Sequence, residues 1–348
     1  MDESLDLTPF SAVLDALQDL GTPFPVRFVR YFSDLTRKNL KDFQHIWPNL
    51  PEQRKVSLLE DLETVLESDT VVNFDNMARA LLNDPLAAVR VIALRLLWEC
   101  EETNLVPDLL SMSITDPDET TRATAAAVLG KFVLLGELET IRADLYEKIV
   151  KHLVSIVEGN DQARVKQRAL ESLGYSSHPS IPGLIQNAYL SNDSGWVTSA
   201  LCAMGRSADD SWAAQVDKLL NSPDPDVQFE AVRAAGELEL TGSREKLLAA
   251  LEYGIEDEEI RLAMIWSLSQ IGGDEVKEKL DELLKNATDD DEVDWIEKAI
   301  DNMEFSTSSG LQTSNFSSED EDELDYGDDD LEDEDDYALY DEDEEDED

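Results

Sequence analysis

The chain has 348 residues, of which 42% are hydrophobic, and a formal net charge of −51. The hydrophobic content is ordinary for a folded protein, so most of the chain can form a core. The charge argues against tight general binding of nucleic acid or anionic membrane and favours basic protein partners.

Residues 1–71 are predicted to form a helical cap that lies outside the repeats that follow. Thr8 and Pro9 pair a capping residue with a first-turn proline, and Thr36 and Pro51 begin further helices. A helix is also predicted to begin at Val26. The cap holds a local concentration of basic residues: Arg27, Arg30, Arg37, Lys38, Lys41, Arg54 and Lys55.

Residues 72–304 contain seven copies of one pattern, and each copy predicts a helix A, a turn and a helix B. An Asp-containing turn precedes an anchor position, a small residue or Met follows four residues later, and an apolar residue follows four after that. Anchors are separated by 32, 44, 31, 31, 33 and 35 residues, a period typical of stacked helical units. The anchors are Val89, Thr121, Val165, Trp196, Val227, Ile260 and Trp295.

Two details of the pattern predict local structure. Gly130, Gly174, Gly205 and Gly236 follow the last apolar position of their units, and they are expected to end helix B in the left-handed conformation. The longest spacing predicts an insertion around residues 136–144 that lengthens a helix or a loop.

The repeats resemble the HEAT-repeat family in its short form, related to the phycobilisome-lyase-type repeats. The resemblance is carried by Asp84, Pro85, Val89, Arg90, Ala93 and Leu97, and by Asp116, Pro117, Arg122, Ala125, Leu129 and Gly130. It implies an all-α fold, a right-handed α-solenoid of about seven helix pairs. The N-terminal segment is similar to that of uncharacterised bacterial HEAT-repeat proteins.

The same resemblance implies an intramolecular ladder of Asp and basic residues between units. The basic residues would be Arg90, Arg122, Lys166 and Arg261, with a structural role in stacking. Val197 and Gln228 occupy this position in two units, so the ladder is expected to be interrupted.

Residues 305–318 are predicted to be a Ser/Thr-rich linker, and residues 319–348 a disordered acidic tail. In the tail 22 of 30 residues are acidic, and such a run cannot bury enough surface to fold. Tyr337, Leu339 and Tyr340 form an apolar island and are candidates for docking to a partner or to the chain itself. The alternatives are a tail that only aids solubility and a weak site for divalent cations.

No motif for catalysis, cofactor binding or metal binding occurs. Phosphate-binding glycine motifs and Cys-x-x-Cys are absent from the sequence, and His45, His152 and His178 form no His-Glu pair. Such pairs supply the iron ligands of the HEAT-repeat hydroxylases. The sequence therefore predicts no enzyme activity, no cofactor and no catalytic or metal site.

The location is predicted to be the cytoplasm. The start of the chain lacks the features of a secretory signal, the two cysteines suit a reducing compartment, and no run of about 18 apolar residues occurs.

Three functions remain open from the sequence. The first is a non-catalytic scaffold or adaptor that binds a protein partner on its concave face, with the acidic tail modulating access or recruiting a basic partner. The second is an acidic chaperone or nucleic-acid mimic for basic proteins. The third is a lyase-like or hydroxylase-like HEAT-repeat enzyme.

Overall fold

The structure is a computed structural model that describes the backbone of residues 9–314 and the side chains of residues 9–305. Contacts divide the chain into two units, Met1–Met303 and Glu304–Asp348. All regular secondary structure in the described residues is helical. This confirms the all-α prediction.

The N-terminal cap is built around a row of aromatic side chains. The rings of Phe10, Phe32, Phe43 and Trp47 follow one another at centroid distances of 5.8, 5.7 and 4.9 Å. Thr36 caps the helix after it by accepting a hydrogen bond from the Asn39 amide at 3.2 Å. The segment after Pro25 is a 3₁₀-helix. The elements of the cap are α1 Phe10–Gln18, η1 Val26–Phe32, α2 Arg37–Ile46, η2 Trp47–Asn49 and α3 Glu52–Ser68.

The seven A–B helix pairs that the repeat predicts are all present. Short 3₁₀ turns, η3 Thr103–Leu105, η4 Asp210–Trp212 and η5 Thr241–Ser243, precede three of the A helices. The pairs are α4 Asp75–Leu81 with α5 Ala87–Leu96, α6 Val106–Thr115 with α7 Glu119–Glu137, α8 Ala143–Glu158 with α9 Ala163–Leu173, α10 Ile181–Tyr189 with α11 Ser194–Arg206, α12 Ala213–Leu219 with α13 Pro225–Glu237, α14 Arg244–Tyr253 with α15 Glu258–Ile271, and α16 Asp274–Asn286 with α17 Asp290–Ser314.

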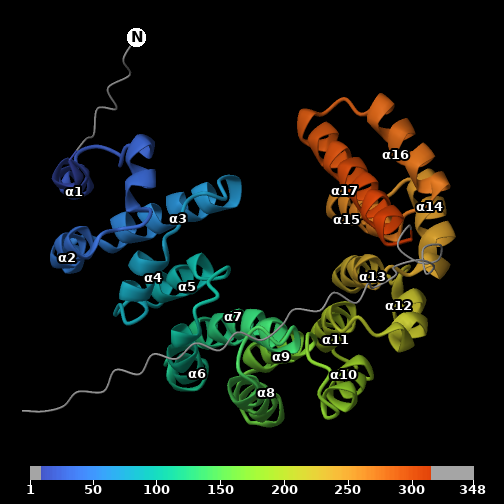
Figure 1. The fold of residues 1–348 in the computed structure, drawn as a ribbon, viewed down its shortest axis with the longest axis horizontal. Helices are drawn as coiled ribbons and strands as arrows, with labels where there is room; N and C mark the ends of the chain where they lie inside the picture. The colour runs from blue at the N-terminus through green and yellow to red at the C-terminus, as the bar shows by residue number, and fades with distance from the viewer. Residues whose placement is uncertain (1–8, 315–348) are drawn as a thin grey trace, which may run out of the picture. The chain divides into compact units, whose positions relative to one another are not determined.

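The B helices of the first unit pack against one another in chain order. Extensive contacts join α3 to α5 and then each of α5, α7, α9, α11 and α13 to the next B helix, as far as α15. The A helices contact mainly their own partners, and in Figure 1 α6, α8, α10 and α12 lie on the outer side of the B helices. The B helices therefore form a continuous inner row.

The expectation for the repeated glycines is wrong. Gly130, Gly205 and Gly236 lie inside α7, α11 and α13, and Gly174 has the right-handed φ of −52°. Instead, each glycine lies against the next B helix. A Cβ on Gly174 would be 2.7 Å from the Cα of Ala203, and one on Gly236 would be 2.7 Å from the Cα of Ser267. The role of these glycines is therefore to permit close packing of neighbouring B helices. The sequence pattern predicts a role in ending the helices instead.

The insertion in the second and third units lengthens two helices. Helix α7 has 19 residues and α8 has 16, whereas α5 and α6 have 10 each. The turn between α7 and α8 places Glu139 at a φ of 56°.

The last helix extends beyond the residue at which the linker is predicted to begin. Helix α17 runs to Ser314 and so includes part of the segment 305–318. The tail and its residues Tyr337, Leu339 and Tyr340 lie outside the described residues.

A buried ion pair joins the N-terminal cap to the first repeat. Lys55 on α3 lies 3.3 Å from the carboxylate of Asp84, with side chains only 5% and 3% exposed. The indole N–H of Trp47 donates a hydrogen bond to the same carboxylate at 2.6 Å. Asp84 belongs to the turn between α4 and α5, so it fixes the cap on the array.

Candidate partner-binding groove

The predicted ladder residues Arg90 and Arg122 connect consecutive turns between helices A and B. Arg90 donates two hydrogen bonds to the carboxylate of Asp116, at 2.8 and 2.6 Å. Arg122 donates in the same way to Asp161, at 2.9 and 2.7 Å. Hydrogen bonding to Arg122 lowers the pKa of Asp161. These arginines use their donors within the fold, as a stacking role requires.

The other ladder positions have different contacts. Lys166 lies over the ring of Trp196, with 5.9 Å from its ammonium nitrogen to the ring centroid. Gln228 donates to the carbonyl of Leu220 at 3.1 Å. Arg261 forms an ion pair with Glu292. In the units around α11 and α13, the turn residues Asp193 and Asp224 instead cap the helices that follow them.

The basic residues of the N-terminal cap divide into two groups, apart from Arg27, whose guanidinium lies 4.9 Å from the ring centroid of Phe28. Arg30 pairs with Asp69 at 3.0 Å, and Arg54 donates to the carbonyls of Asp19 and Thr22 at 2.7 and 2.6 Å. Together with Lys55, these residues stabilise the cap. Three others are exposed on α2: Arg37, Lys38 and Lys41.

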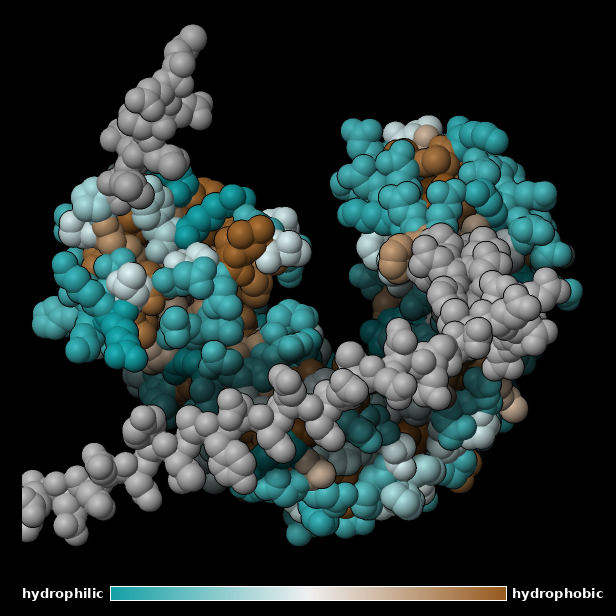
Figure 2. All heavy atoms as spheres, in the orientation of Figure 1, coloured by the Kyte–Doolittle hydropathy of each residue, from teal (hydrophilic) through white to brown (hydrophobic). Residues whose placement is uncertain are grey.

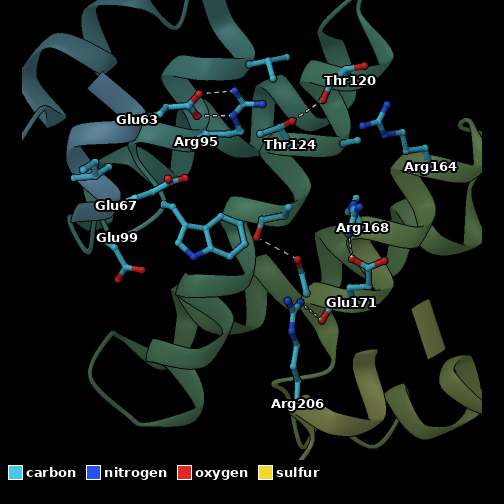
Figure 3. A pocket seen from close by; sticks show the side chains of 16 residues that line it. Glu63, Glu67, Arg95, Glu99, Thr120, Thr124, Arg164, Arg168, Glu171 and Arg206 are labelled. Atoms are coloured by element: carbon cyan, nitrogen blue, oxygen red, sulfur yellow. Dashed lines mark hydrogen bonds and ion pairs between the residues drawn. The ribbon is translucent and has the colours of Figure 1, made fainter. Parts of the chain in front are cut away.

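A groove of about 690 Å³ runs along the inner row of B helices. Its walls come from α3, α5, α7, α9 and α11, and Figure 3 shows the side chains that line it. Trp98, in the turn after α5, has its side chain in the groove and is 41% exposed. Leu66, Val91, Ala123 and Ala127 add apolar surface. The groove can therefore hold an apolar side chain.

The two ends of the groove carry different charges. At the α3–α5 end, Arg95 is held by Glu63 through two hydrogen bonds of 2.5 Å, and Glu67 and Glu99 lie nearby (Figure 3). At the α9–α11 end the charged residues are Arg164, Arg168, Glu171 and Arg206. The first end is acidic overall and the second is basic.

The basic end continues into an adjoining cavity of about 420 Å³ between α9, α11 and α13. Arg233 joins it from α13 and pairs with Glu230 and Glu237 at 3.1 and 3.0 Å. Burial raises the pKa of Glu230, and Arg233 lowers it in part. We call Arg164, Arg168, Arg206 and Arg233 the arginine cluster.

Three polar atoms of this cavity lack hydrogen-bond partners among the described residues. They are Oγ1 of Thr198, Nε of Arg233 and Oε1 of Glu230, although the last lies within ion-pair distance of Arg233. The thiol of Cys202 is also in the cavity, and burial raises its pKa, so it stays protonated at neutral pH.

The histidines lie apart from the groove. His152 on α8 contacts the hydroxyl of Ser113 at 2.8 Å, and burial lowers its pKa. His178 lies beside the hydroxyl of Ser180 at 2.8 Å. In the part of the chain that the structure describes, no group of three or more His, Cys, Asp or Glu side chains is placed to hold a metal ion.

The repeat pattern does not predict the groove residues as a site, although the sequence contains a signal for them. Thr120, Arg164 and Asp226 each lie one residue before an anchor, and Arg95 and Arg233 lie six residues after one. Positions −1, +3, +6 and +10 relative to the anchors follow helical spacing, so they share one face of each B helix. Because their residue types differ between units, they do not appear as a repeat.

The surface hydropathy can be followed in Figure 2. The face shown in Figure 2 is mostly hydrophilic, with hydrophobic residues exposed in small areas. Among residues 9–314, no helix is both long and apolar enough to cross a membrane.

Comparisons with known proteins concern the fold. A search of curated proteins found no match. Among solved structures, the complex of CpcE and CpcF of phycocyanin lyase from Nostoc sp. PCC7120 is 20% identical, with a TM-score of 0.44, covering 66% of this chain and 94% of that one. Human deoxyhypusine hydroxylase in complex with glycerol is 14% identical, with a TM-score of 0.34, covering 85% and 96%.

The match to a family is local and covers the last repeats. Residues 213–301 match the model of HEAT repeats. This segment begins at α12 and ends within α17, and the pairs from α4 to α11 have the same A–B order. Residues 213–301 of the chain are therefore HEAT repeats.

Proposed function

We propose that the chain is a non-catalytic scaffold or adaptor that binds a segment of a partner protein in the groove of the inner row. The observation that carries this proposal is the groove itself, which combines an exposed tryptophan with charged residues from α3, α5, α9 and α11. Interfaces concentrate their binding energy in such aromatic and arginine side chains.

The length of the groove supports a peptide as the ligand. Packed helices lie about 8–10 Å apart, so five helices in a row extend over roughly 32–40 Å. An extended peptide of about a dozen residues covers this distance at about 3.3 Å per residue. The acidic and basic ends then favour a segment with opposite charges at its two ends.

The test is affinity capture with the whole protein and two variants. Trp98→Asp replaces an apolar side chain of the groove with a charge. The amount of captured partner should fall about tenfold, which corresponds to a loss of about 1.4 kcal/mol in binding free energy. Ile114→Asp is the matched control because Ile114 is 53% exposed on α6 and does not line the groove. The captured proteins are compared by quantitative mass spectrometry.

The outcomes separate the candidate functions. Loss of one partner with Trp98→Asp but not with Ile114→Asp supports the scaffold. Capture of many basic proteins that is equal in all three samples and is lost at high salt favours the acidic chaperone instead. A reproducible enzyme activity without any captured partner overturns the proposal.

A further inference from the structure

The arginine cluster is unusual in a chain with 79 acidic and 28 basic residues. Arg164 is exposed in the first turn of α9, and no carboxylate within ion-pair distance of it is found among the described residues. Arg206 likewise has no carboxylate partner there. It donates to the backbone carbonyl of Glu171 at 3.0 Å, and its guanidinium lies 5.0 Å from the ring centroid of Tyr175.

The other two arginines of the cluster keep part of their charge accessible. Arg168 lies one turn after Arg164 and pairs with Glu171 at 2.6 Å, yet its side chain is 50% exposed. Arg233 also pairs with carboxylates and is 34% exposed, with an unpartnered Nε. Four guanidinium groups thus share one cavity with Glu171, Asp226 and Glu230, and Arg233 also pairs with Glu237 beside it.

This arrangement favours an anionic ligand. Guanidinium groups bind carboxylates through paired hydrogen bonds, and such bonds gain strength where water is partly excluded. Trp98 lines the same groove as Arg164, Arg168 and Arg206. A ligand with carboxylates next to an aromatic side chain could contact the arginine cluster and the apolar surface around Trp98 together.

The chain itself contains such a segment. We propose that the arginine cluster binds carboxylates of the acidic tail, residues 319–348 of the same chain, and that Tyr337 and Tyr340 lie against the apolar surface around Trp98. The description of the backbone ends at Ser314, and 34 residues follow it. Tyr337 and Tyr340 are 23 and 26 residues beyond Ser314, and a coil of that length would have a root-mean-square span of roughly 24–31 Å.

The net charge of the body does not oppose this binding strongly. Residues 1–298 carry −27, but at physiological salt charges are screened over about 8 Å. Acids farther than this from the cluster therefore contribute little repulsion. The proposal goes beyond the scaffold function, since the tail would occupy the groove in the purified chain with no partner present.

The experiment uses the full chain with the photoreactive residue p-benzoylphenylalanine in place of Tyr340, and maps cross-links by mass spectrometry. Cross-links are expected to residues of α9, α11 and the turn that carries Trp98. In the variant Arg164→Glu/Arg168→Gln their yield should fall about fivefold, the ratio for about 1 kcal/mol. The control variant Arg142→Glu/Lys148→Gln makes the same change in charge at the outer helix α8: Arg142 directly precedes this helix and Lys148 lies on it. This control should leave the cross-link yield unchanged.

Several outcomes overturn the proposal. One is a cross-link yield that is the same in the wild type and in both variants. Another is a cross-link map centred on Arg37, Lys38 and Lys41 of α2. Cross-links between light and isotope-labelled copies would assign the tail to a second molecule. Because no partner is needed, a failed partner capture leaves this test unaffected.

Discussion

Gly236 shows how one residue sets the distance between two B helices. A Cβ at this position would lie 2.7 Å from the Cα of Ser267 and 2.5 Å from the side-chain oxygen of Gln270. Gly236→Ala is therefore expected to force α13 and α15 apart and to lower the free energy of unfolding by about 1–3 kcal/mol. Urea denaturation followed by circular dichroism measures the change.

Gly183→Ala is the matched control for this prediction. Gly183 also lies inside a helix, α10, but a Cβ there would meet nothing within 4 Å. Its substitution should raise the free energy of unfolding by roughly 0.5–1 kcal/mol, because alanine favours the helix. Equal stabilisation by both substitutions would show that Gly236 is not a packing residue.

The contrast between Gly236 and Gly183 also shows what a sequence can predict at this scale. The repeat identifies Gly130, Gly174, Gly205 and Gly236 as a set, but the sequence pattern predicts that they end helices. A glycine after an apolar residue is compatible with either role in sequence. The difference depends on residues about 30 positions further along, such as Ser267, whose backbone lies against it.

At the scale of elements, the junction between the N-terminal cap and the first repeat depends on Asp84. Asp84→Asn would leave the ammonium of Lys55 buried without a charged partner. Removing one partner of a buried pair costs about 3–5 kcal/mol. The free energy of unfolding of the cap is expected to fall by this amount, as measured by hydrogen exchange of α3 amides.

Glu99→Gln provides the comparison for Asp84→Asn. Glu99 pairs with Lys131 at 3.1 Å, but its side chain is 73% exposed. Exposed pairs contribute about 0–1 kcal/mol, so this substitution should have little effect. Faster exchange of α3 in both variants, to the same extent, would contradict a special role for the buried pair.

The helix pairs could be predicted from the sequence because their signals are local. Asp-containing turns, apolar positions at helical spacing and a fixed period all lie within one unit, and α4 to α17 follow them. The groove could not be predicted in this way. Arg206 and Arg233 come from different units, and only the packing of α11 against α13 brings them into one cavity.

At the scale of the whole molecule, the charged residues fall into two classes. Some form buried ion pairs inside the stacked array, and the remaining acids contribute to its net negative charge. The buried ladder pairs, such as Arg90 with Asp116, are local and satisfied. The remaining acids give residues 1–298 a net charge of −27, and like charges destabilise a compact state. The composition alone predicts this repulsion. Which basic residues escape neutralisation, as Arg164 does, depends on the fold.

Raising the NaCl concentration should therefore increase the thermal stability of the array. Screening weakens repulsion between exposed acids, while the buried pairs are affected much less. A gain of about 1 kcal/mol corresponds to a rise in Tm of roughly 2–4 °C for a domain of this size. Differential scanning calorimetry of the full chain at low and high NaCl measures this rise in Tm.

Two controls test this explanation. The Arg164→Glu/Arg168→Gln variant should show a similar rise in Tm, because the repulsion involves the whole body. KCl at equal ionic strength should have the same effect as NaCl. A Tm that falls with salt would mean that ion pairs such as Arg122 with Asp161 outweigh the repulsion.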